Sequence, residues 1–200
     1  MAAVFQRRWL ASTSQDNTVR AWNVDDGEEM LRFRAPVVSG RVLPLADGER
    51  FLTMGRGLDG VVLWDVLAKQ GCEVESLRDV AGLLPDGTVL GSSNSEPRRL
   101  VAWNPRTGAC RTLWEELFAS PIAVSADGRL VATWESHGFV ESRCQETHQV
   151  RVWDVATRRE LASPGKCWWP KAAEFAPDGK SLLAVSQSGS LVRVVLDIPK

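Results

Sequence analysis

The residues best suited to coordinate a metal ion lie in one segment, residues 136–148. It contains both histidines of the chain, His137 and His148, together with Cys144, and two glutamates lie between the histidines. Imidazole and thiolate are ligands that zinc prefers. The spacing matches no standard zinc pattern, however, because a second Cys-x-x-Cys-like pair is missing. We therefore predict no metal here and expect a solvent-exposed insertion.

A glycine-rich segment is a second candidate for ligand chemistry. Residues 55–60 read Gly-Arg-Gly-Leu-Asp-Gly and match the dinucleotide-binding fingerprint letter for letter. That fingerprint works by opening a helix whose N-terminal amides bind the pyrophosphate. Residues 61–66 read Val-Val-Leu-Trp-Asp-Val, which indicates a strand instead. We expect the glycines to form a turn, and no cofactor is predicted.

No catalytic constellation emerges from the remaining residues. A Ser-His-Asp triad needs a histidine, and both histidines lie in the insertion. The sequence contains no phosphate-binding loop, no His-Glu-x-x-His and no Gly-x-Ser-x-Gly. The formal net charge of −1 argues against a general polyanion binder, and no apolar run reaches the length that spans a bilayer. We therefore expect no enzymatic activity, and binding to neither nucleic acid nor membrane.

The elements that must position these residues repeat along the chain. Residues 18–24 read Thr-Val-Arg-Ala-Trp-Asn-Val, and the same frame returns at residues 60–66, 99–105 and 149–155. Aliphatic residues followed by Trp and then Asp or Asn are typical of a strand that ends in a polar turn. The recurring residues are Trp22, Trp64, Trp103 and Trp153. Their steps of 42, 39 and 50 residues indicate a repeat architecture.

A second marker has the same period. Asp-Gly pairs begin at Asp47, Asp86, Asp127 and Asp178, and each precedes an apolar run. Asp-Gly between two apolar runs is a strong signal for a β-hairpin. Each unit therefore reads strand, Asp-Gly turn, strand, polar turn, strand with the Trp, polar turn and strand. This order predicts a four-stranded meander.

These units resemble the tryptophan–aspartate (WD) repeat family of β-propellers. The best-matching copies are residues 9–24 and 149–160, and residues 173–184 carry the family's Ala-Pro-Asp-Gly turn. The resemblance covers nearly the whole chain and implies an all-β propeller. The family's Gly-His is missing, and only Asp16 occupies the position of the aspartate that this histidine binds. We therefore expect a divergent and less rigid propeller.

We expect one domain over residues 1–200 with about five four-stranded blades. The blades are predicted at about residues 2–34, 37–77, 80–117, 121–163 and 168–198. Residues 2–5 could serve as a short first strand, but the first blade is expected to be incomplete because residues 6–8 replace its Asp-Gly turn. The last blade is expected to lack a fourth strand. Residues 111–118 also fit a short helix, but we predict a strand. Open sheet edges at both ends favour an open arc or a fragment over a closed five-bladed ring.

The cysteines and the N-terminus predict the compartment. Cys72, Cys110, Cys144 and Cys167 have no close pairing, and three of them fall near the last strands of successive blades. The first eight residues lack the order of a secretory signal peptide. We therefore expect reduced thiols in a cytoplasmic protein.

The predicted partner-binding surface lies beside the insertion. The interval from Leu10 to Trp22 is 12 residues, and the matching interval from Val131 to Trp153 is 22, so the fourth blade carries about ten extra residues. In the family this loop lies on the top face, where partners usually dock. Aromatic residues near an arginine are typical anchors of a binding surface. The predicted contacts are Trp134, His137, Arg143, His148, Trp168 and Trp169, although one or two of the three indoles could instead fill the core. The recurring Trp22, Trp64, Trp103 and Trp153 are predicted to pack between blades.

We predict a non-enzymatic scaffold that binds a protein partner through the top face of the propeller. One alternative is a regulatory or sensor module of a larger signalling protein. Another is an enzymatic or small-ligand propeller whose site lies in a central channel, which needs acids, histidines or metal ligands from several blades. Missing blades are expected to come from the rest of a longer chain or from a partner subunit.

Overall fold

The computed structural model shows a chain built of β-strands. It describes residues 2–4, 9–14, 16–34, 41–54, 60–115, 119–137, 147–162, 170–186 and 189–196. All regular structure in these residues is strand. None of the described segments forms a helix of the length and apolarity that crossing a membrane requires. The chain divides into two compact units, Met1–Asp79 and Val80–Lys200.

The described strands form five antiparallel sheets, which we number in chain order. Sheet 1 contains β1 (Ala2–Val4), β2 (Trp9–Thr13), β3 (Thr18–Asn23) and β4 (Glu29–Arg34). Sheet 2 contains β5 (Val42–Pro44), β6 (Arg50–Met54), β7 (Val61–Asp65) and β8 (Gln70–Glu73). Sheet 3 contains β9 (Leu77–Leu83), β10 (Val89–Ser93), β11 (Leu100–Trp103) and β12 (Cys110–Trp114).

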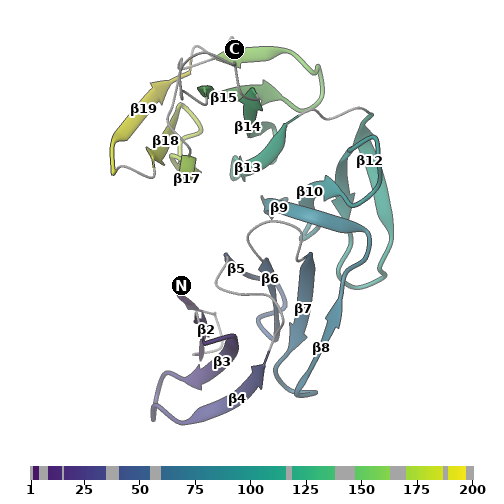
Figure 1. Cartoon of the computed structure of the whole chain (residues 1–200), viewed down its shortest axis with the longest axis vertical. Coiled ribbons are helices and arrows are strands. Elements are labelled where there is room, and N and C mark those ends of the chain that lie inside the picture. Colours follow the sequence, from purple (N-terminus) through teal and green to yellow (C-terminus); the bar gives the residue numbers. More distant parts are fainter. Residues whose placement is uncertain are drawn as a thin grey trace. The chain divides into compact units, whose positions relative to one another are not determined.

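Sheet 4 contains β13 (Ser120–Val124), β14 (Leu130–His137), β15 (Thr147–Asp154) and β16 (Glu160–Ala162). Sheet 5 contains β17 (Pro170–Phe175), β18 (Ser181–Ser186) and β19 (Leu191–Val195). In every sheet each strand pairs with the next strand of the sequence. Figure 1 shows this order for β6, β7 and β8. The predicted meanders are therefore confirmed, and the expectation of one domain forming an open arc stays a prediction.

Sheet 1 corrects the expectation of an incomplete first blade. Its first strand is present, and Ala2, Ala3 and Val4 pair with Ser12, Ala11 and Leu10. β1 therefore completes a four-stranded sheet, although residues 6–8 contain no Asp-Gly pair. Sheet 5 has three strands among the described residues, as expected for the last blade.

Two strands occupy segments for which the sequence also allowed a helix or a cofactor-binding loop. β12 covers Cys110–Trp114, so this part of the segment that also fitted a helix is a strand. β7 begins directly after Gly60, whose φ is 74°. The glycine-rich segment therefore leads into a strand rather than the helix that a dinucleotide site requires. Its residues 55–59 lie outside the described residues.

One end of each sheet is built from turns that an aspartate or asparagine caps. After the Asp-Gly aspartate, a backbone amide donates to the carboxylate, as at Asp47, Asp86, Asp127 and Asp178. In the turn from the third to the fourth strand, the cap is the residue that follows the repeat Trp, namely Asn23, Asp65, Asn104 or Asp154. Such caps stabilise the turn locally. We call this end the capped end, and the end where the second strand leads into the third the hairpin end.

Three of the repeat indoles donate a hydrogen bond across the sheet. Trp64 Nε1 donates to Thr53 Oγ1 at 2.8 Å, and the same bond joins Trp22 to Ser12 at 3.1 Å and Trp153 to Thr133 at 2.9 Å. Each acceptor lies on the second strand, two residues beyond the residue that pairs with the Trp. The hydroxyl therefore satisfies a donor that would otherwise be buried without a partner.

Two of these indoles lie between neighbouring sheets. Phe33 of β4 stacks on Trp64 of sheet 2 with 5.3 Å between ring centroids. Trp114 of β12 meets Trp153 of sheet 4 edge-on at 6.0 Å, and its Nε1 donates to the carbonyl of Val155 at 2.9 Å. In both cases the outer strand of one sheet supplies the ring that covers the indole of the next sheet. Ring pairs of this kind add to the energy of area burial.

Trp64 also fixes the residue opposite it on β8. Gly71 pairs with Trp64, and a Cβ placed on Gly71 would lie 2.5 Å from two atoms of the indole ring. A glycine is therefore required where the ring lies against the neighbouring backbone.

Sheet 5 lacks both parts of the indole bond. The amide of Leu196 donates to the carbonyl of Lys180 as the amide of Val155 does to that of Arg129. This equivalence places Val194 where sheet 4 has Trp153. Ala184 then occupies the place of Thr133, by the strand register. The donor and its acceptor are thus absent together.

The first prediction concerns the buried indole bond. Thr53 is 2% exposed and Trp64 is 5% exposed. Thr53→Val keeps the volume but leaves the indole N–H without an acceptor, and we expect it to lower the free energy of unfolding by about 1 to 3 kcal/mol. Urea titration measures this change. Thr112→Val, on the exposed strand β12, is the matched control and should change stability by less than about 0.5 kcal/mol. Equal effects of the two variants would contradict the assigned role of the bond.

The second prediction concerns acid sensitivity at the capped end of sheet 4. The Arg129 guanidinium, which donates to Asp154 at 2.9 Å, and the Thr157 amide lower the pKa of Asp154 from 3.8 to about 2. Folding favours the ionised form, so this stability is full above pH 4 and is lost as the pH falls toward 2. In Asp154→Asn, we expect the free energy of unfolding to fall less steeply over that range. Arg129→Gln should flatten the same slope, and an unchanged slope in both variants would exclude this ion pair as its source.

Candidate interaction surface

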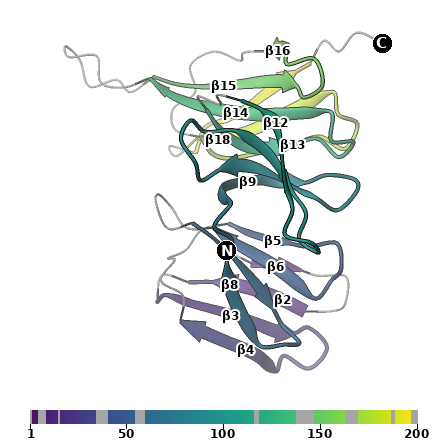
Figure 2. The same cartoon turned by 90° about the vertical axis from the view of Figure 1, so that its right-hand side faces the viewer.

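The additional residues of the fourth repeat lengthen a hairpin. β14 and β15 pair continuously from Leu130 opposite Asp154 to His137 opposite Thr147. Figure 2 shows the two strands alongside each other as the long strands of sheet 4. β2 and β6, at the same position in sheets 1 and 2, have five residues each, whereas β14 has eight. The insertion therefore begins as an extension of regular sheet at the hairpin end.

Trp134 lies on this hairpin at the edge of a buried cluster. It pairs with Val150 and packs, half buried, against a core formed with sheet 5. Members of that core include Ala132, Val150, Val152, Leu182 and Val194. Trp134 is thus held in place by the packing of sheets 4 and 5. Its role in binding a partner stays a prediction.

The structure brings three of the six predicted contact residues to one hairpin. His137 pairs with Thr147, and His148 pairs with Ser136, so both histidines are in strands close to Trp134. The other predicted contacts, Arg143, Trp168 and Trp169, lie outside the described residues, as does Cys144. Among the side chains that are described, no three His, Cys, Asp or Glu residues gather in a way that could hold a metal ion.

The other face of the hairpin carries a charged group that the sequence analysis did not single out. The Arg151 guanidinium lies 5.9 Å from the centroid of the Trp153 ring. It also forms an ion pair with Glu160 at 3.2 Å and donates to the side chain of Gln149 at 3.3 Å. A cation held over an indole is attracted by its electron-rich face. Trp153 therefore has two neighbours, the Arg151 guanidinium and the ring of Trp114.

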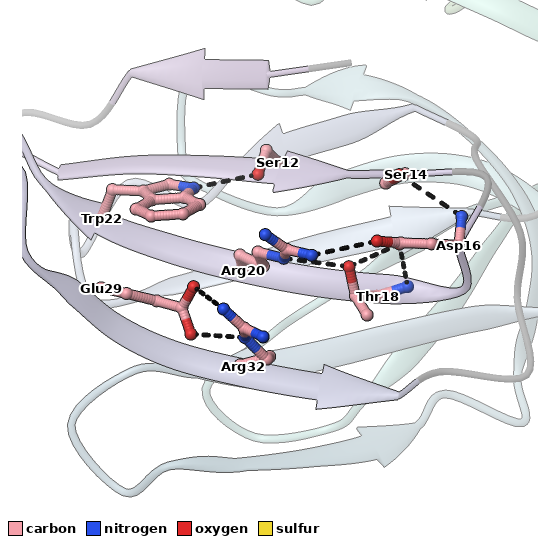
Figure 3. A network of polar contacts seen from close by, with 8 residues as sticks. All are labelled: Ser12, Ser14, Asp16, Thr18, Arg20, Trp22, Glu29 and Arg32. Atoms are coloured by element: carbon pink, nitrogen blue, oxygen red, sulfur yellow. Dashed lines mark hydrogen bonds and ion pairs between the residues drawn. The ribbon is translucent and has the colours of Figure 1, made fainter.

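Sheet 1 repeats this arrangement on its own indole (Figure 3). The Arg20 guanidinium lies 5.9 Å from the centroid of Trp22 and forms an ion pair with Asp16 at 3.0 Å. The hydroxyl and amide of Thr18 both donate to Asp16. These bonds, the hydroxyl bond first, lower the pKa of Asp16 to about 2. Asp16 is therefore ionised at neutral pH, and its carboxylate is bound by Thr18 and Arg20 of β3.

A second ion pair lies beside this network on β4. Glu29 accepts two hydrogen bonds from Arg32, at 2.6 and 2.7 Å. The bonded guanidinium lowers the pKa of Glu29 below its usual value of 4.5. Figure 3 shows Asp16, Arg20 and Trp22 together with this pair. The face of sheet 1 that carries Trp22 is thus an indole surrounded by paired charges of both signs.

The thiols of the described part are exposed. Cys72 and Cys110 lie on the outer strands β8 and β12, and neither forms a disulfide. Cys144 and Cys167 lie outside the described residues.

Sequence reasoning missed the hydroxyls that accept the indole bonds, although the signal was present. Ser12, Thr53 and Thr133 all lie on the strand before the Trp, at one place in the register. Sheet 3 lacks the hydroxyl there, because Gly91 occupies the matching position opposite Val101. The aromatic partners Phe33 and Trp114 had no such periodic signal.

Comparisons with known proteins bear on the fold. No protein-family model matches the sequence, and a search of curated proteins finds no match. The chain is similar to the solved structure of TolB from Acinetobacter baumannii, with a TM-score of 0.68 and 17% sequence identity. The likeness covers 94% of this chain and 49% of that one, so the chain spans about half the length of the TolB chain. At this identity the likeness concerns the fold alone, and the fold of this chain is β-propeller-like.

Proposed function

We propose that the chain is a non-enzymatic protein-interaction scaffold of the WD-repeat type, and that it binds its partner at the hairpin end of its sheets. The observation that carries the proposal is the extended β14–β15 hairpin with Trp134 anchored at its base. A propeller-like fold offers rigid sheets whose connections can vary without loss of the core. An extended hairpin on such a scaffold is a natural contact surface.

Two features support the WD-repeat type. Trp22, Trp64 and Trp153 bond to a hydroxyl on the preceding strand. The residue after each repeat Trp, which is Asp or Asn, caps the next turn. In each Trp-Asp or Trp-Asn pair, the Trp packs beside the sheet and the Asp or Asn closes the turn.

One observation favours a module of a larger protein as the second candidate. The chain spans about half of the solved chain that it resembles. In that case the hairpin end would serve as a regulatory or sensor surface within a longer chain. The wide spacing of the four cysteines in the sequence supports a cytoplasmic location for both candidates.

The third prediction tests the hairpin end. Residues 138–146 are replaced by Asn-Gly, which joins His137 to Thr147 through a two-residue turn and keeps the pairing of β14 with β15. A second variant combines Trp134→Ala with Trp168→Ala. We expect both to reduce partner recovery at least about tenfold in quantitative affinity capture, because interface anchors of this kind carry most of the binding energy. The loop replacement should unfold at the same temperature as the wild-type chain.

The matched control removes exposed apolar groups at the opposite end. Val24 is 53% exposed and Leu67 is 63% exposed, and both lie in turns at the capped end. Val24→Ser combined with Leu67→Ser should leave recovery unchanged. If the control loses the partner while the loop replacement retains it, the binding surface is at the capped end and the proposal is wrong.

A further inference from the structure

Neighbouring sheets in this chain pack by one rule. Sheet 1 turns Ala11, Val19 and Ala21 toward Phe51 and Trp64 of sheet 2. Sheet 4 in the same way turns Ala132, Val150 and Val152 toward Leu182 and Val194 of sheet 5. In both pairs, the aliphatic face of one sheet meets the indole face, or its equivalent, of the sheet that follows it. We call these the forward face and the indole face.

The forward face of sheet 5 is exposed. By register, Leu183, Leu191 and Arg193 occupy the places of Ala132, Val150 and Val152. Leu183 of β18 is 40% exposed. On β19, Leu191 is 66% exposed and Val195 is 72% exposed. Large aliphatic side chains gathered on one sheet face need a partner more than scattered ones do. The corresponding face, which consists of alanine and valine, is buried in sheets 1 and 4.

The complementary surface is present on the same chain. The indole face of sheet 1 carries Trp22, half buried beneath Arg20. Arg151 over Trp153 in sheet 4 is the same pair, and there a ring from the preceding sheet, Trp114, covers the indole. An arginine at this position is therefore compatible with a covered indole face, because its stem packs while its head reaches the rim.

The charges of the two faces also match. Glu174 and Arg193 flank Leu183 on the forward face of sheet 5, since they hold register positions on either side of it. The indole face of sheet 1 presents Arg20 and Asp16. Each face therefore presents both signs of charge, which on sheet 5 lie at the places of Ala123 and Val152 in sheet 4. Charges of both signs on each face let the two faces form ion pairs when they meet.

We infer that the forward face of sheet 5 binds the indole face of sheet 1 of a second copy of this chain. The association is head to tail, so it uses two different surfaces rather than one self-complementary patch. It reproduces between copies the contact that joins sheet 1 to sheet 2 and sheet 4 to sheet 5 within a copy. It is independent of the hairpin end, so it holds or fails separately from the proposed scaffold function.

The fourth prediction tests this association on the 200-residue chain by sedimentation velocity from ~1 to ~100 µM, a range suited to micromolar dissociation constants. The monomer mass is 22.0 kDa, and we expect the mean mass to rise with concentration. Leu183→Asp with Leu191→Asp places two carboxylates on the forward face. Arg20→Glu with Arg32→Glu reverses two charges on the indole face. Each double variant alone should associate at least about tenfold more weakly than the wild-type chain. It should therefore remain monomeric over this concentration range.

Mixing the two double variants supplies the deciding measurement. Each retains the surface that the other has lost, so an equimolar mixture should form a one-to-one dimer that stops growing. Val24→Asp, which adds a carboxylate at an exposed turn outside both faces, should associate like the wild-type chain. Circular dichroism of each variant confirms that it is folded. A wild-type chain that stays monomeric over the whole range, or a mixture that stays monomeric while the wild type associates, would overturn the inference.

Discussion

The arrangement of this chain depends on how a large indole is accommodated beside a β-sheet. The ring of Trp64 contributes apolar area between sheets, but its N–H is buried with it and needs an acceptor. A hydroxyl at one fixed place on the preceding strand supplies that acceptor, and the opposite strand leaves room by having Gly71. In sheet 5 the indole and its acceptor are both replaced by apolar residues. Val194 replaces the Trp and Ala184 the hydroxyl, so neither polar group is left without its partner.

The two ends of each sheet follow different rules. At the capped end, Asp or Asn side chains bind backbone amides within a few residues, so the turn is fixed by local chemistry. In sheet 4 the turns also bind each other, because Arg129 beside the first turn donates to Asp154 in the second. At the hairpin end the connections differ in length from sheet to sheet, and β14–β15 extends furthest among the described strands. Connections of different length are tolerated at the hairpin end because the core does not depend on them.

These differences explain what the sequence could predict. The period of the Trp residues and the Asp-Gly turns gave the five meanders, because strand alternation and turn capping are local properties. Sequence reasoning failed where a neighbouring sheet decides the outcome. Phe33 and Trp114 cover indoles in the next sheet, and nothing in their local sequence marks this contact. For Trp134 the sequence left both a surface and a core position open, and the core shared with sheet 5 decides that it is half buried. The first blade was expected to be incomplete, although residues 2–5 could form a strand, because no Asp-Gly pair marks its first turn.

The position two residues before the repeat Trp shows how these sheets combine polar and apolar contacts. Sheet 2 has Val62 there, and it packs with the cluster around Trp64. Sheets 1 and 4 have Arg20 and Arg151, each over its own indole. A guanidinium can replace an aliphatic group at this place because its flat face stacks on the ring while its N–H groups reach a carboxylate at the rim. Indole faces of both kinds can therefore be covered by another sheet, and the nature of this residue decides how much of the contact depends on salt concentration.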